Sequence, residues 1–146
     1  MGFVYGLWLL ALGSLAVPHL VISKFANAKK ILDKLAPFQG WIGLISGVWG
    51  LYEIIWMLSA LTFLKEGLKG FVHFAIIAAA VICQIVLGFI LGIGVVKSFV
   101  KDGQAQAKLD QIFEKILPYQ LLFGVLAIAD GFALVAVTLV PTILGP

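Results

Sequence analysis

Two acidic residues, Glu53 and Asp130, lie within long runs of apolar residues. A charged carboxylate that faces lipid near the bilayer centre costs at least ~2.5–3.5 kcal/mol. Each acid must therefore face protein, water or a proton. One interpretation is a proton or cation site that also uses Gln84 and Ser14, whose positions in their own runs bring them near the depth of Asp130. The other interpretation is a protonated, hydrogen-bonded acid that joins helices, because no Lys or Arg lies at that depth.

The other residues capable of chemistry are isolated from one another. His19 and His73 fall at opposite ends of their apolar runs, so a membrane thickness separates them and they do not form a pair of metal or haem ligands. Each is a possible single ligand to a haem, pigment or quinone, or a polar residue at the water boundary. Cys83 is the single cysteine, which excludes an intrachain disulfide and a thiolate metal cluster. Because nucleotide, zinc-protease and nucleophile motifs are absent, we expect no enzyme and no metal site, and the sequence leaves any cofactor unknown.

The elements that must position these residues are apolar helices. Hydrophobic residues make up 62% of the chain, whereas soluble domains contain ~45–50% apolar residues. A helix needs ~20 residues to cross ~30 Å of hydrocarbon. Runs of that length cover residues 3–22, 40–63, 71–96 and 120–143. The sequence therefore predicts an all-α integral membrane protein with four transmembrane helices.

A short polar pattern occurs twice, each time at the start of an apolar run. Residues 33–52 align without gaps on residues 114–133, and residues 21–25 align on 95–99. The alignment predicts two parallel-duplicated hairpins, residues 1–64 and 71–146, within a single membrane domain. Identical residues at the first pair of segments are Lys34/Lys115, Pro37/Pro118, Gln39/Gln120, Gly43/Gly124 and Gly50/Gly131.

The lysines predict the orientation. All ten basic residues are lysines, and eight of them lie in the two long connections between the runs. Positively charged connections remain in the cytoplasm. We therefore expect a prokaryotic cytoplasmic membrane, with both termini outside and the long connections inside.

Each long connection has the pattern of an amphipathic helix, which we expect to lie at the membrane interface until Pro37 or Pro118 ends it. Its basic side chains either anchor a simple connector or form a docking surface for lipid head groups. The basic residues predicted to face lipid are Lys29, Lys30, Lys34, Lys108 and Lys115.

Small residues line one face of several runs, and such faces let membrane helices approach closely. These faces serve either packing within the chain or contact with another subunit. We therefore expect a non-catalytic subunit or scaffold of a larger or homo-oligomeric membrane complex, without a nucleic-acid partner. The alternatives are a proton or cation channel or transporter that uses Asp130 and Glu53, and a pigment-, haem- or quinone-binding subunit. The helix-packing residues are Gly43, Gly47, Gly50, Gly88, Gly92, Gly124 and Gly131.

Overall fold

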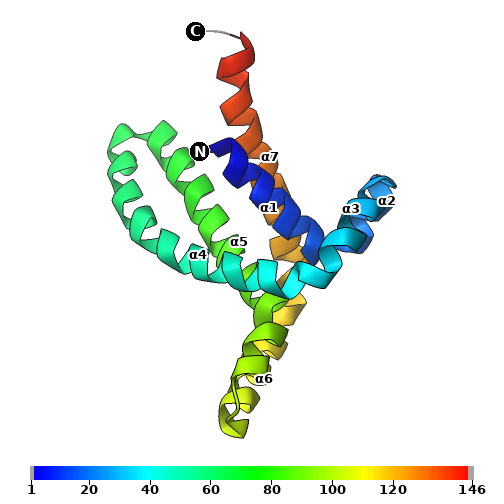
Figure 1. Ribbon diagram of the computed structural model, residues 1–146. Helices are drawn as coiled ribbons and strands as arrows, with labels where there is room; N and C mark the ends of the chain where they lie inside the picture. The colour runs from blue at the N-terminus through cyan, green and yellow to red at the C-terminus, as the bar shows by residue number, and fades with distance from the viewer. Residues whose placement is uncertain (1, 145–146) are drawn as a thin grey trace.

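The structure is a computed structural model that describes residues 2–144, and the side chains of residues 2–139. Every element in this part of the chain is a helix (Figure 1). In chain order the elements are α1 (Gly2–Ala16), α2 (Pro18–Lys24), α3 (Ala28–Leu35), η1 (Ala36–Phe38), α4 (Gln39–Ala60), η2 (Leu61–Glu66), α5 (Leu68–Phe99), α6 (Gly103–Ile116), η3 (Leu117–Tyr119) and α7 (Gln120–Leu144), where η denotes a 3-10 helix.

Several helical stretches have the length and composition needed to cross a membrane. Three of them qualify directly: Ala28–Glu66, Leu68–Phe99 and Gly103–Leu139. A fourth span is obtained only when the bent pair α1 and α2 is counted as one. The all-helical prediction is thus confirmed for the described residues, and the apolar helices are compatible with membrane insertion.

The first predicted span, residues 3–22, is not a continuous helix. α1 ends at Ala16, and α2 begins at Pro18 at an angle of 104° to α1. Proline has no N–H to donate to the preceding turn and disfavours helical dihedrals at the residue before it. Val17 accordingly has φ −130° and ψ 56°. Pro18 therefore bends the first predicted run, and residues 3–22 count as one span only when α1 and α2 are taken together.

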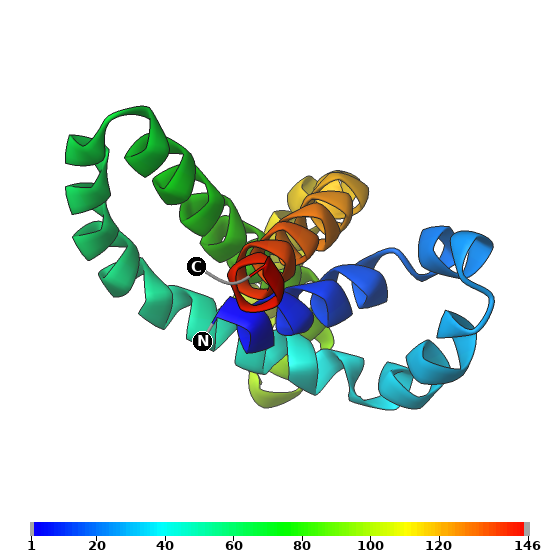
Figure 2. The ribbon, with the colours of Figure 1, turned by 90° about the horizontal axis from the view of Figure 1, so that it is seen from above.

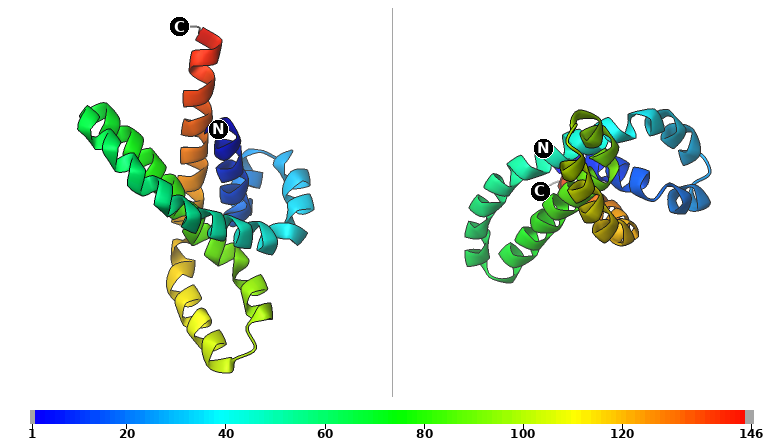
Figure 3. Two further views of the ribbon diagram at one scale, coloured as in Figure 1. Left: turned by 60° about the vertical axis from the view of Figure 1, so that its left-hand side comes forward. Right: turned by 90° about the horizontal axis from the view of Figure 1, so that it is seen from below.

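Pro37 and Pro118 lie in the 3-10 turns η1 and η3, each of which joins a short helix to a long one. The residues that precede the turns have similar dihedrals, φ −84° and ψ −23° at Leu35 and φ −91° and ψ −28° at Ile116. Neither turn interrupts the helical structure, so α4 follows α3 directly and α7 follows α6 directly, with a marked bend between α3 and α4 (Figure 3). The prolines change the helix geometry without separating the amphipathic helix from the span.

The long helices pack as two pairs, α1 with α7 and α4 with α5. α5 also contacts α7 and α1, so it lies at the centre of the arrangement. The turn between α4 and α5 extends away from the α1–α7 pair (Figures 1 and 2). Gly67 in that turn has φ 73°, a conformation that L side chains rarely adopt. Each pair combines a helix of residues 1–64 with a helix of residues 71–146.

Glycines let the backbones approach closely in both pairs. Between α4 and α5, a Cβ atom added to Gly88 would overlap the backbone of Gly47. Between α1 and α7, a Cβ atom added to Gly13 would lie 2.7 Å from the carbonyl oxygen of Gly124. Atoms at such distances repel each other strongly, so these positions admit no side chain without movement of the helices. The small-residue faces therefore pack within the chain.

The two helix pairs have the same register at the glycines that align in the sequence. The aligned glycines of α4 and α7 are 81 residues apart, and the residues that they contact on α5 and α1 are 74 residues apart. The second spacing is also that of the aligned segments 21–25 and 95–99. The contacts that keep this spacing are Gly43 with Leu91, Gly50 with Gln84, Gly124 with Val17, and Gly131 with Leu10. The atoms nearest to Gly43, Gly50 and Gly131 belong to the adjoining residues Gly92 and Ile85 and to Gly6.

The connection between α5 and α7 folds into a hairpin in which α6 contacts the end of α5. Lys97 donates to Asp110 Oδ1 at 2.7 Å, and Gln106 Nε2 donates to the carbonyl oxygen of Val100 at 2.6 Å. Asp102 caps α6 by accepting a backbone N–H at 3.0 Å. α6 thus packs against the end of α5.

Candidate functional site

Glu53 of α4 links α4 to α1 through its carboxylate. The Tyr5 hydroxyl of α1 donates to Oε2 at 2.7 Å, and Trp49 Nε1–H, one turn earlier on α4, donates to Oε1 at 2.7 Å. Both carboxylate oxygens therefore have a donor. Polar groups removed from water are tolerated when they are hydrogen-bonded. The contact joins a helix of the first apolar run to one of the second.

A second set of hydrogen bonds lies two turns away along α4, at Ser46. Trp8 Nε1–H of α1 donates to Ser46 Oγ at 3.0 Å, and Gln84 Nε2 of α5 donates to the Ser46 carbonyl oxygen at 3.2 Å. Ser46 and Gln84 are fully buried. Hydrogen bonds between membrane helices contribute ~0.6 kcal/mol on average and ~1.7 kcal/mol at most. This set therefore adds modestly to the glycine packing and fixes the rotation of three helices.

Two buried oxygens near these bonds, Gln84 Oε1 and Asp130 Oδ2, have no hydrogen-bond partner among the described residues. Asp130 of α7 immediately precedes Gly131, whose backbone packs against Gly6 of α1, the residue after Tyr5. An acceptor buried without a donor costs ~1–3 kcal/mol. A carboxyl group can supply its own donor by binding a proton. We use "polar cluster" for the set Tyr5, Trp8, Ser46, Trp49, Glu53, Gln84 and Asp130.

The polar cluster offers acids and hydrogen-bond donors from four helices. Among the described residues, no group of three His, Cys, Asp or Glu side chains is placed to hold a metal ion. Ion pairing in the same part of the chain is found at Lys97 and Asp110, outside the cluster. The chemistry that the cluster supports is the joining of helices by hydrogen bonds and the binding of a proton.

Of the predicted polar candidates, Glu53, Gln84 and Asp130 belong to the polar cluster, but Ser14 does not. Ser14 lines a separate depression with Leu10 and Leu32, between α1 and α3. Ser14 was expected near Asp130 because the two residues have similar depths in their apolar runs. Depth along a helix does not determine which side of the helix a residue faces. The structure therefore brings Ser14 beside α3 and does not bring it into the polar cluster.

The two histidines are exposed and lie on different elements. His73 of α5 packs edge-to-face against Phe63 of η2, with ring centroids 5.1 Å apart. His19 of α2 lines a cavity beside the break at Pro18. The five lysines predicted to face lipid are all exposed, and they are Lys29, Lys30, Lys34, Lys108 and Lys115.

The sequence analysis did not identify the side chains that donate hydrogen bonds to Glu53 and Ser46. Trp49 carries a signal, because a residue four positions before Glu53 lies on the same helix face. Tyr5 and Trp8 carry none, because their partners are 48 and 38 residues away. Only the packing of α1 against α4 brings them together.

The fold and the polar cluster define an all-helical protein with apolar helices suited to membrane insertion. No protein-family model, curated protein or solved structure matches the chain. The function is therefore argued from the residues and contacts of this chain.

Proposed function

We propose that the protein is a four-span integral membrane protein built from two parallel-duplicated hairpins. α1 and α2 together form its first span, and α4, α5 and α7 form the others. Its role is that of a non-catalytic subunit or scaffold in a homo-oligomeric or larger membrane complex. Its partners are lipid and neighbouring membrane helices.

The matching register of the helix pairs supports the duplication. α1 packs on α7 and α5 packs on α4, so the first helix of each hairpin contacts the second helix of the other. A pseudo-two-fold axis along the membrane normal would generate such an exchange. Contacts at the aligned glycines include pairs that keep both the 81-residue and the 74-residue spacing of the sequence alignment.

The lysine distribution supports an orientation with the long connections in the cytoplasm. In a Cys83→Ala background, a cysteine at Ala107 should react with a membrane-impermeant reagent only from the cytoplasmic side. A cysteine at Leu68 should react only from the outside. Leu68 is exposed and avoids the neighbouring Gly67, whose φ of 73° does not suit a side chain. Reversed labelling of the two cysteines would contradict the orientation.

The proposal of a neighbouring subunit is based on the exposed face of α4 that contains Tyr52. Tyr52 is 55% exposed, lies about midway along the apolar run, and has a hydroxyl without a hydrogen-bond partner among the described residues. Lipid chains offer no acceptor to a hydroxyl at that depth. Trp49 and Trp56 extend the same exposed face. A helix from another subunit would cover the aromatic side chains and accept the hydrogen bond.

Cysteine cross-linking in native membranes tests this face. In the Cys83→Ala background, Val48→Cys places a thiol one turn from Tyr52, and Val48 is exposed. We expect it to form a cross-linked dimer or an adduct with a partner protein. Ala129→Cys is the matched control, because Ala129 is exposed at the aligned position of α7. Cross-linking at neither position, or equally at both, would contradict a specific contact on α4.

The second candidate function is conduction of a proton or cation through the polar cluster. The observation that favours conduction is that two buried oxygens, Gln84 Oε1 and Asp130 Oδ2, have no hydrogen-bond partner among the described residues. Glu53 favours it less, because its two oxygens already accept hydrogen bonds from Tyr5 and Trp49. A flux through reconstituted vesicles that vanishes with Asp130→Asn would establish this function and overturn the first proposal.

A further inference from the structure

A cavity of about 540 Å³, widely open to the surface, lies at the point where α1 ends. α2 turns away there, so no helix continues along the start of α7. In the other pair α5 does continue, and Val95 packs on Gly40 of α4. Leu121, which aligns with Gly40, lines the cavity instead. The cavity therefore occupies the space that an unbroken first helix would fill.

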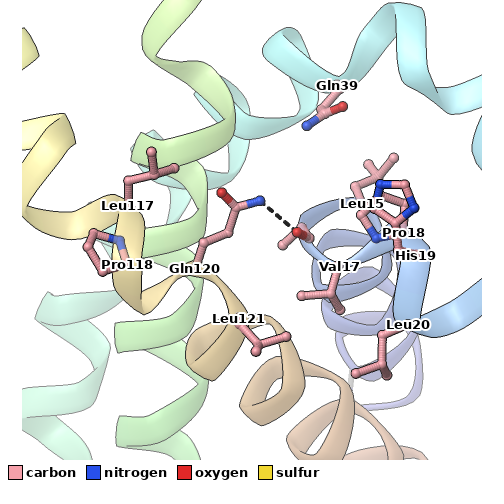
Figure 4. A pocket seen from close by; sticks show the side chains of 11 residues that line it. Leu15, Val17, Pro18, His19, Leu20, Gln39, Leu117, Pro118, Gln120 and Leu121 are labelled. Carbon is pink, nitrogen blue, oxygen red and sulfur yellow. Dashed lines mark hydrogen bonds between the residues drawn. The ribbon is translucent and has the colours of Figure 1, made fainter.

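Three polar side chains line this cavity from three elements (Figure 4). Gln120 of α7 donates Nε2–H to the carbonyl oxygen of Ala16 at 2.6 Å, which fixes the position of its amide. The amide of Gln39 points toward the cavity, and the ring of His19 lies beside Pro18 (Figure 4). Neither Gln39 nor His19 has a hydrogen-bond partner among the described residues. The cavity thus contains two free polar groups.

The rest of the lining decides the class of ligand. It is aliphatic or proline, with Leu15, Leu117 and Pro118 among its residues, and it contains no charged side chain. Sites for phosphate head groups use Arg, Lys or clusters of N–H donors. Amide and imidazole groups in an apolar setting are suited instead to carbonyl or hydroxyl oxygens, and small-molecule sites combine an apolar lining with a few such groups.

We propose that this cavity binds the ring of a membrane-soluble quinone or quinol. Gln39 and His19 hydrogen-bond the ring oxygens, and the leucines contact the ring and the first part of its tail. The opening lies where α1 and the start of α7 meet, which is the cytoplasmic boundary in the orientation proposed above. A lipid-soluble ligand reaches it from the bilayer without crossing the polar cluster. The inference concerns binding alone and holds whether or not the protein is part of an oligomer.

Titration of the protein in lipid nanodiscs with a decyl-substituted benzoquinone tests the proposal. We expect saturable binding of one quinone per chain by calorimetry. His19→Leu and Gln39→Leu should each raise the dissociation constant about tenfold or more, because each removes one hydrogen bond to the ring. Leu117→Trp should abolish binding by filling the cavity. His73→Leu is the matched control and should bind the quinone with unchanged affinity.

Three results would overturn the proposal. The first is the absence of saturable binding to the wild-type protein. The second is equal affinity in wild type, His19→Leu and Gln39→Leu, provided that their melting temperatures are unchanged. The third is displacement of the quinone by phosphatidylglycerol at comparable concentration, which would assign the cavity to a phospholipid head group. Variants that melt early are replaced by Gln39→Met, which keeps the size of the side chain, and the same tenfold loss is expected.

Discussion

The α4–α5 and α1–α7 pairs cross in the same register, but their helices continue differently beyond the crossing. α5 runs on to Phe99, where α6 folds back along it, whereas α1 ends at Ala16 and the α2–α3 segment turns to the side (Figures 1 and 3). The residue of α5 that aligns with Pro18 is Gly92, which packs against the backbone of α4. A proline in place of a glycine thus converts a helical extension into a bend. A change of residue type at one position can therefore leave the helix crossing intact and still open a cavity beyond it.

The largest effect that we expect comes from comparing one glycine of α5 with one glycine of α7. Gly88→Ala would place a methyl group on the backbone of Gly47, so we expect a loss of ~2–3 kcal/mol in the free energy of unfolding. Gly124→Ala should cost less, ~1 kcal/mol, because the atoms that it meets belong to the side chains of Val17 and Ala16. Reversible unfolding in mixed micelles measures both values.

Gly47→Ala is the control for the same crossing. A Cβ atom on Gly47 would lie 3.5 Å from the nearest backbone atom of Gly88, which is ordinary contact. We expect a change within ~0.5 kcal/mol. Equal losses for Gly47→Ala and Gly88→Ala would show that the helices do not cross in the register described here.

The next prediction concerns the bend between α1 and α2 at Pro18. Pro18→Ala restores the missing N–H and removes a penalty of ~3 kcal/mol for a continuous helix. Spin labels at Leu7 and Lys24, in a Cys83→Ala background, should then move apart toward ~25 Å, the separation along a straight helix at ~1.5 Å per residue. The same substitution should weaken quinone binding, because the straightened helix occupies the cavity. An unchanged label distance would mean that packing of α2 against α3, and not Pro18, maintains the bend.

Different kinds of information explain which features the sequence predicted. The helical class and the proline turns depend on residues close together in the chain, so run lengths and the repeated Lys34 and Lys115 segments were sufficient. The position of the break was visible at Pro18, but its angle depends on contacts of α2 with α3. The pairing of α1 with α7 was not predictable, because a glycine face indicates close packing without identifying the helix that it meets.

Some residues of the candidate site were also predictable from the sequence, and others were not. Glu53 and Asp130 were identifiable, because acids are rare within apolar runs. Tyr5 and Trp8 were not, because aromatic residues near the end of a span are common anchors at the membrane boundary. Ser14 lies apart from them beside α3, because similar depth along two helices does not bring their side chains to the same face. Contacts between distant segments therefore had to come from the structure.

The smallest expected effects concern the polar cluster. Asp130→Asn keeps the size of the side chain and one set of hydrogen bonds, so folding and assembly should remain nearly intact. Asp130→Leu and Tyr5→Phe should each lower the free energy of unfolding by ~1–2 kcal/mol at most. The same unfolding measurement in micelles applies. A much larger loss with Asp130→Asn would indicate an ionised acid with an essential partner.

The mass of the native assembly tests the proposed subunit function most directly. The protein is extracted from its membrane into nanodiscs without detergent, and everything that co-purifies is weighed by native mass spectrometry. We predict a multiple of the 15.7 kDa chain or a complex with a second membrane protein. A single 15.7 kDa chain with no partner would contradict the proposal that the protein acts as a subunit or scaffold.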